Sequence, residues 1–194
     1  VIVIDEIQSY KNSLWSEIII FFKEFSKLLD IKIIIMSATL PNLDLLTNSS
    51  EKAINLITNR EKYFNHKKFA KRVRLNYELL QGKIKKEELV DHVLKHKSGK
   101  IVIEFIKKSS AEEFYELLKE YTDAPIFLMT GDSSIQERKN IIKKVEKMSY
   151  VILVATQVVE AGVDIDMDIG YKDISKLDSE EQFIGRINRS GRKS

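Results

Sequence analysis

Two acidic residues, Asp5 and Glu6, directly follow the apolar run VIVI at residues 1–4. Such a run predicts a buried strand, and ligands of open α/β sheets bind at the carboxyl ends of the strands. There an Asp can hold Mg²⁺ through its water ligands, and an adjacent Glu can orient or deprotonate a water that attacks a phosphoanhydride. On its own, such a pair more often caps a strand end in solvent, so it has to be weighed together with other motifs.

Hydroxyl residues and a glycine follow two further predicted strands. Ser37 and Thr39 come at the end of the apolar run at 32–37, where their hydroxyls can bond neighbouring carboxylates. A turn closed by the following proline is the plain alternative. Thr156 ends the run VILVAT and can offer its hydroxyl and nearby backbone N–H groups to a phosphate. Gly162 then permits a backbone conformation, or a close approach, that a Cβ would block.

Near the end of the chain, QFIGRINRSGR places Gln182, Arg186 and Arg189 at helical spacing i, i+4 and i+7. A helix predicted over 179–188 would set them on one stripe. Arginines that converge on a transferring phosphoryl group accelerate its transfer by roughly 10³ to 10⁵. A solvated basic helix face is the plain alternative.

Asp164, Asp166 and Asp168 alternate in the segment after Gly162. Alternating acids invite a calcium interpretation, but an EF-hand loop requires Gly where this chain has Ile169. We therefore reject calcium there. A phosphate loop of the form G-x-x-x-x-G-K-[ST] is also missing from the sequence.

Short β-branched runs alternate with longer periodic segments, a pattern typical of mostly parallel sheets with crossover helices. The sequence thus predicts an α/β fold in two lobes, residues 1–62 and 75–194, joined by a basic linker at 63–74. The predicted strands are 1–4, 32–37, 73–80, 100–105, 125–130 and 151–156, and the predicted helices are 13–29, 43–47, 50–57, 84–97, 109–121, 134–147 and 179–188.

The composition suits a globular protein of 194 residues, with 43% hydrophobic and 31% charged residues. Its formal net charge of +3 is too small to imply a polyanionic partner by its sign alone. The chain has no Cys, which fits a reducing compartment, so we expect a cytoplasmic location. Its apolar runs fall far below the ~20 residues that span a bilayer, so we expect no membrane partner. Because it opens on a buried strand without Met, we expect an excerpt of a larger protein.

The order VIDEIQ, SATLP, VATQVVEAGVDID and QFIGRINRSGR resembles motifs II to VI of a superfamily 2 helicase. More narrowly, it is similar to the helicase part of the CRISPR-associated helicase/nuclease of type I CRISPR systems. The likeness covers nearly the whole chain. It implies two partial RecA-like lobes, with motifs II and III in 1–62 and motifs IV to VI in 75–194.

The resemblance assigns a role to each candidate residue. It makes Asp5 the Mg²⁺-binding acid, through water, and Glu6 the water-activating acid, while Arg186 and Arg189 face the γ-phosphate. The remaining candidates, with roles in coupling or in nucleotide and nucleic-acid binding, are Ser37, Thr39, Gln182, Thr156, Gly162 and Asp164. The chain departs from the family at Phe183, where an Arg is usual, and this leaves the role of that position open.

The resemblance also implies the activity. The parent protein would use ATP and Mg²⁺, bound between the lobes, to move on single-stranded DNA after recruitment by a guide-RNA surveillance complex. Without its own phosphate loop, the excerpt alone should bind ATP poorly. Two alternatives remain open, another superfamily 2 helicase acting on RNA or in repair, and a non-catalytic remnant that only binds nucleic acid.

Overall fold

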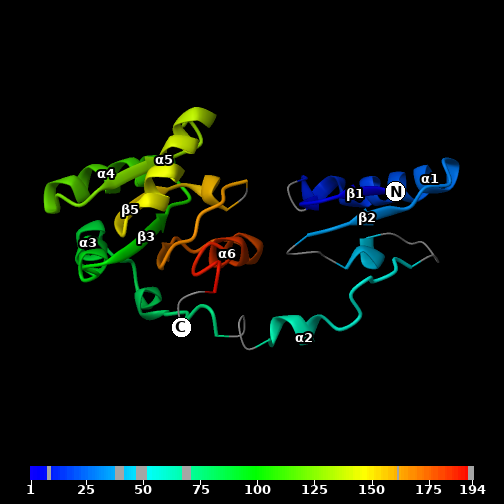
Figure 1. Ribbon diagram of the computed structural model, residues 1–194, viewed down its shortest axis with the longest axis horizontal. Coiled ribbons are helices and arrows are strands. Elements are labelled where there is room, and N and C mark those ends of the chain that lie inside the picture. Colours follow the sequence, from blue (N-terminus) through cyan, green and yellow to red (C-terminus); the bar gives the residue numbers. More distant parts are fainter. Residues whose placement is uncertain (8–9, 38–41, 47–51, 67–70, 161, 192–194) are drawn as a thin grey trace. The chain divides into compact units, whose positions relative to one another are not determined.

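The computed structural model describes residues 1–194 except 8–9, 38–41, 47–51, 67–70, 161 and 192–194. The chain divides into two units, Val1–Arg60 and Glu61–Ser194 (Figure 1). Each of them has its own parallel β-sheet.

The first unit contains two parallel strands, β1 (Ile2–Ile4) and β2 (Ile33–Ile35). Parallel neighbours require a crossover connection. Here it is supplied by the 3₁₀ turn η2 (Asn12–Leu14) and the helix α1 (Trp15–Leu28), and a second 3₁₀ turn, η3 (Leu43–Leu46), follows β2. The predicted strands at 1–4 and 32–37 are therefore present in shortened form.

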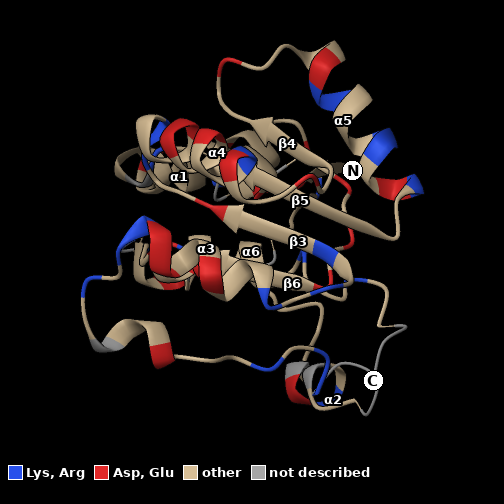
Figure 2. Ribbon diagram, turned by 90° about the vertical axis from the view of Figure 1, so that its left-hand side faces the viewer, with Lys and Arg blue, Asp and Glu red and all other residues tan. Residues whose placement is uncertain are grey.

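The second unit contains a four-stranded sheet in the order β4-β5-β3-β6, in which every neighbouring pair is parallel. Its strands carry few charged residues, whereas its helices carry many (Figure 2). The strands are β3 (Gly99–Glu104), β4 (Ile126–Met129), β5 (Tyr150–Ala155) and β6 (Ile169–Lys172).

Helices cover both faces of this sheet because successive side chains of a buried strand point to opposite sides. Helices α3 and α4 pack on the face of Ile101 and Ile103, and helices α5 and α6 pack on the face of Val102. The helices and turns of this part of the chain are α2 (Arg60–Phe64), η4 (Glu78–Gln81), α3 (Lys86–Leu94), α4 (Lys108–Tyr121), α5 (Ile135–Lys147), η5 (Gln157–Val159) and α6 (Leu177–Ile184).

One strand prediction is wrong and one strand was missed. Residues 73–80 do not form a strand; they run irregularly into η4. The strand that was missed is β6, which pairs with β3 so that Gly170 lies opposite Val102. Packing outweighed local propensity in both cases, since Val73 packs on the core without joining the sheet, and β6 forms despite a glycine in its interior.

Two helix predictions also need correction. Residues 52–57 are not helical, although a helix was predicted over 50–57. The helix predicted over 179–188 begins earlier, at Leu177, and ends at Ile184. After Ile184 the backbone continues in tighter turns, in which the N–H of Arg186 donates to the carbonyl of Phe183 at 2.8 Å, and Asn188 then takes a positive φ of 44°.

The α/β fold with parallel sheets flanked by helices is confirmed, whereas the two partial RecA-like lobes and the boundaries 1–62, 63–74 and 75–194 remain predictions. Among the helices that the structure describes, none is long and apolar enough to cross a bilayer.

Candidate nucleotide and nucleic-acid site

The acidic pair lies at the carboxyl end of β1, as the sequence predicts. Asp5 directly follows the strand, and its Oδ1 accepts a hydrogen bond of 2.9 Å from the backbone N–H of Glu6. Glu6 has a positive φ of 55°, which bends the chain sharply at this point. Both acids are exposed, so they are accessible to a solvated ion or a phosphate.

Ser37 follows the neighbouring strand in parallel register. Ile4 lies opposite Ile35, and the N–H of Met36 donates to the carbonyl of Ile4 at 2.8 Å. The ends of β1 and β2 therefore bring the segments with Asp5 and Ser37 to one sheet edge. Thr39, the other predicted residue of this motif, lies outside the described residues.

Thr156 and Gly162 flank a short turn after β5. Thr156 is buried, with 6% of its surface exposed, and its N–H donates to the carbonyl of Met129 at 3.1 Å. Gly162 has a φ of +70°, which strains any L side chain, and a Cβ there would meet nothing within 4 Å among the described residues. Glycine at 162 thus suits this backbone conformation.

The two arginines do not share a helix stripe with Gln182, because α6 ends at Ile184. Gln182 lies within α6, whereas Arg186 and Arg189 lie in the turns that follow it. Both arginines nevertheless reach the segment after β5. The Nη2 group of Arg186 donates to the carbonyl of Glu160.

Arg189 contacts the alternating acids. Its Nη1 atom lies 3.2 Å from Oδ1 of Asp164, and both side chains are largely exposed. The backbone of the acidic segment also pairs with the backbone of the segment that carries the arginines, since Met167 and Ile187 form a parallel β-bridge. Within the second unit the structure therefore brings Arg189 to Asp164 and Arg186 to Glu160, which the spacing alone did not predict.

The remaining two acids of this segment hold the backbone. Asp166 accepts from the backbone N–H groups of Arg189 at 2.7 Å and Ser190 at 3.2 Å. Partial burial acts to raise the pKa of Asp166, but the hydrogen bonds from Ser190 and Arg189 outweigh it and lower that pKa. Asp168 accepts from the N–H of Lys100 at 2.7 Å. Each carboxylate thus has a separate partner.

Phe183, the position whose role was open, is a core residue. It is 5% exposed and packs with Ile187 against β6. At Gly170 an added Cβ would come within 2.7 Å of the side chains of both Phe183 and Ile187. The close approach of α6 to β6 thus requires glycine at 170, a residue that the sequence analysis did not single out.

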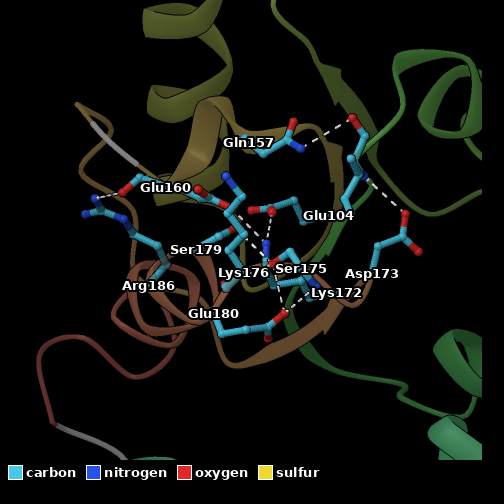
Figure 3. Close-up of polar contacts among 11 residues, drawn as sticks. Glu104, Gln157, Glu160, Lys172, Asp173, Ser175, Lys176, Ser179, Glu180 and Arg186 are labelled. Carbon is cyan, nitrogen blue, oxygen red and sulfur yellow. Dashed lines mark hydrogen bonds and ion pairs between the residues drawn. The ribbon is translucent and has the colours of Figure 1, made fainter. Parts of the chain in front are cut away.

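A buried ionic cluster lies beside these segments, and no motif or spacing in the sequence predicts it. Lys172 at the end of β6 donates to Glu104 at the end of β3 and, at 2.8 Å, to Glu160 (Figure 3). The side chains are 5%, 1% and 11% exposed, respectively. The cluster was missed because Lys172 belongs to the strand that was not predicted.

The pKa values of the two carboxyls in this cluster shift in opposite directions. Burial, together with a hydrogen bond to Glu160, raises the pKa of Glu104 to about 8, although Lys172 partly offsets both. Burial also acts to raise the pKa of Glu160, but its hydrogen bonds to Glu104, Lys172 and Ser179 outweigh burial and lower that pKa. The two carboxyls therefore titrate as a coupled pair, in which Glu104 holds its proton more tightly than Glu160.

Residues 95–192 match the family described as CRISPR-associated nuclease/helicase Cas3, C-terminal. The chain is 27% identical over 203 residues to the CRISPR-associated nuclease/helicase Cas3 of Methanothermobacter thermautotrophicus. That alignment covers 97% of this chain but only 24% of the relative, so the chain spans about a quarter of the relative's length.

Solved structures share the fold. The crystal structure of T. fusca Cas3 with ATP matches with a TM-score of 0.71 at 15% identity, over 97% of this chain and 27% of that chain. A chain of a CRISPR RNA-guided surveillance complex in the pre-nicking state matches with a TM-score of 0.63 at 16% identity, over 96% and 28%. S. cerevisiae Dbp5 bound to RNA and ADP BeF3 matches with a TM-score of 0.60 at 21% identity, over 99% and 51%.

Proposed function

Because this chain belongs to the family of the C-terminal part of the CRISPR-associated nuclease/helicase Cas3, we propose that it is part of an ATP-dependent motor that moves on single-stranded DNA in CRISPR interference. One observation within the family-matched region carries the proposal. There Arg186 and Arg189 are both held by the segment that follows β5, through Glu160 and Asp164. Guanidiniums placed at a transferring phosphoryl group stabilise the charge that develops in its transition state.

In the proposed motor, Arg186 and Arg189 bind the γ-phosphate of ATP and stabilise the charge that develops there. Glu6 orients the attacking water and accepts its proton, while Ser37, Thr39 and Gln182 link hydrolysis to movement. We place motifs II and III in 1–62, a linker in 63–74 and motifs IV to VI in 75–194.

Asp5 fits a Mg²⁺ ligand. Its carboxylate is exposed, and carboxylate oxygen is the ligand type that Mg²⁺ prefers. In the part of the chain that the structure describes, no three His, Asp or Glu side chains converge on one point. A Mg²⁺ ion held by Asp5 through water would have water and phosphate oxygens as its direct ligands, in keeping with its reluctance to lose its water shell. It would supply charge neutralisation at the phosphates.

Single-stranded DNA is the proposed track and a guide-RNA surveillance complex the proposed recruiter. A structure of such a complex contains a chain with this fold. We assign Thr156 and Gly162 to the nucleic-acid side of the site, and Asp164 to the nucleotide or to coupling. Contacts to the DNA backbone would make binding tolerant of sequence and sensitive to salt.

The test is ATP hydrolysis by the full-length protein with and without single-stranded DNA. We expect DNA to stimulate hydrolysis, and we expect Glu6→Gln to abolish the stimulated rate because the water loses its base. Glu24→Gln, at an exposed carboxylate of α1, is the matched control and should keep the rate. An unstimulated wild-type protein, or a Glu6→Gln variant with an unchanged rate, would rule out the motor.

A second candidate, a helicase that acts on RNA, is favoured by the likeness to Dbp5, which was solved with RNA. The same assay separates the two candidates when single-stranded RNA replaces DNA at equal nucleotide concentration. Greater stimulation by RNA than by DNA would favour the second candidate.

A further inference from the structure

The buried cluster connects parts of the site that come from distant points of the sequence. Lys172 has three N–H donors, and its ammonium group contacts Glu104 and Glu160 (Figure 3). It donates to Glu104 and to Glu160, and it lies 5.3 Å from the centre of the Phe183 ring. One side chain at the end of β6 therefore contacts β3, the segment after η5, and α6.

Burial makes this arrangement costly. Removing charges from water costs several kcal/mol per ion, so a buried ion pair is weak evidence for a stabilising role. The side chains of Lys172 and Glu104 are 5% and 1% exposed, so both groups lose nearly all of their contact with water. The cluster is thus poorly explained by stability, and fixing the conformation of its surroundings is the better explanation.

Glu160 provides the link to the site. Its carboxylate accepts from Lys172 and from Ser179, while its main-chain carbonyl accepts from Arg186. A shift of the Glu160 backbone would therefore shift the group that holds the Arg186 guanidinium. Lys172 limits such a shift by tying the Glu160 side chain to the ends of β3 and β6.

We propose that Lys172 is a positioning residue for Arg186, acting through Glu160, so that the guanidinium is held ready for the γ-phosphate. This inference rests on the proposed function, in which Arg186 contacts ATP. Lys172 itself does not contact the nucleotide.

The experiment compares Lys172→Met, Arg186→Ala and the double variant in the full-length protein. Misplacing a catalytic group by about 1 Å costs roughly 100-fold in rate, so we expect Lys172→Met to lower kcat for DNA-stimulated ATP hydrolysis by about that factor. kcat and kcat/KM for ATP should fall together, because the lost interaction belongs to the transition state. The double variant should be no slower than Arg186→Ala.

Two further variants guard against a simple folding defect. Lys172→Met leaves the Glu160 carboxylate without its ammonium partner, so Lys172→Met combined with Glu160→Gln removes both charges. We expect this neutral variant to fold, as judged by thermal unfolding, and still to have a low kcat. Lys119→Met removes an exposed lysine paired with Glu116 on α4, and it should keep the wild-type kcat.

The outcomes separate this inference from the proposed function. If Arg186→Ala keeps the wild-type kcat, the proposed function fails at Arg186. If Arg186→Ala is slow but a folded neutral variant turns over at the wild-type rate, only the role of Lys172 is overturned. Losses that multiply in the Lys172→Met and Arg186→Ala double variant would also overturn it, because the two residues would then act independently.

Discussion

The Glu104 carboxyl shows how burial and neighbouring charges compete at one residue. Its pKa is raised to about 8, because its burial and its bond to Glu160 outweigh the attraction of Lys172. In the unfolded chain it would titrate near 4.5. The folded protein thus retains a proton that the unfolded chain releases between these two values.

This difference predicts how stability depends on pH. Because the folded state binds more protons than the unfolded state, the Glu104 contribution is fully present below pH 4.5 and is lost as the pH rises to about 8. The free energy of unfolding should therefore show a downward slope as the pH rises through this window. The pKa of Glu160 is lowered and that of Lys172 is raised, so neither titrates within this window.

Chemical denaturation at several pH values measures this slope. We expect Glu104→Gln, which mimics the protonated form, to remove the decline between pH 4.5 and pH 8. Glu113→Gln changes an exposed carboxylate and should keep the decline. A Glu104→Gln variant with the slope of the wild type would show that Glu104 is ionised in the folded protein.

At the scale of elements, the contact between α6 and β6 positions the segment with both arginines. Gly170 makes this contact possible, because a Cβ there would lie 2.7 Å from Phe183 and from Ile187. Overpacking of a core typically costs about 1 to 3 kcal/mol. We therefore expect Gly170→Ala to lower the unfolding free energy by about this amount, with a matching fall in the melting temperature.

Gly82→Ala is the matched control for this prediction. Gly82 has an extended backbone, with a φ of −178°, and a Cβ there would meet nothing within 4 Å among the described residues. The melting temperature of the Gly82→Ala variant should stay close to that of the wild type. Equal melting temperatures for the two glycine variants would mean that α6 packs less closely on β6 than the structure indicates.

The elements differed in how far the sequence could predict them. Strands β1 and β5 were predicted from continuous apolar runs, which are typical of buried parallel strands. Burial is confirmed for β5 but was wrong for β1, whose Ile2 and Val3 are exposed because β2 is its one neighbouring strand among the described residues. β6 was missed because only long-range pairing with β3 makes a strand of a segment that contains Gly170. The early end of α6 was missed because i, i+4 spacing describes a helix but does not show where the chain leaves it.

At the scale of the whole molecule, the motif residues were predicted from their types and from the resemblance. The buried residues that hold the segments around them, Glu104 and Lys172, were not predicted. Asp5, Glu6, Arg186 and Arg189 could be named from their spacing and order. Glu104 and Lys172 carry no motif, and they meet only because β3 and β6 pair side by side. Contacts of this kind depend on sheet order, which a single sequence does not show.

We propose that Glu6 and Arg186 act in the hydrolysis of the same ATP molecule. The most direct test of this proposal is kcat for DNA-stimulated ATP hydrolysis by the full-length protein carrying Glu6→Gln, Arg186→Ala or both. Residues that act as a unit in one transition state give non-additive losses. We predict that the double variant loses no more than the slower single variant, and losses that multiply would contradict the claim.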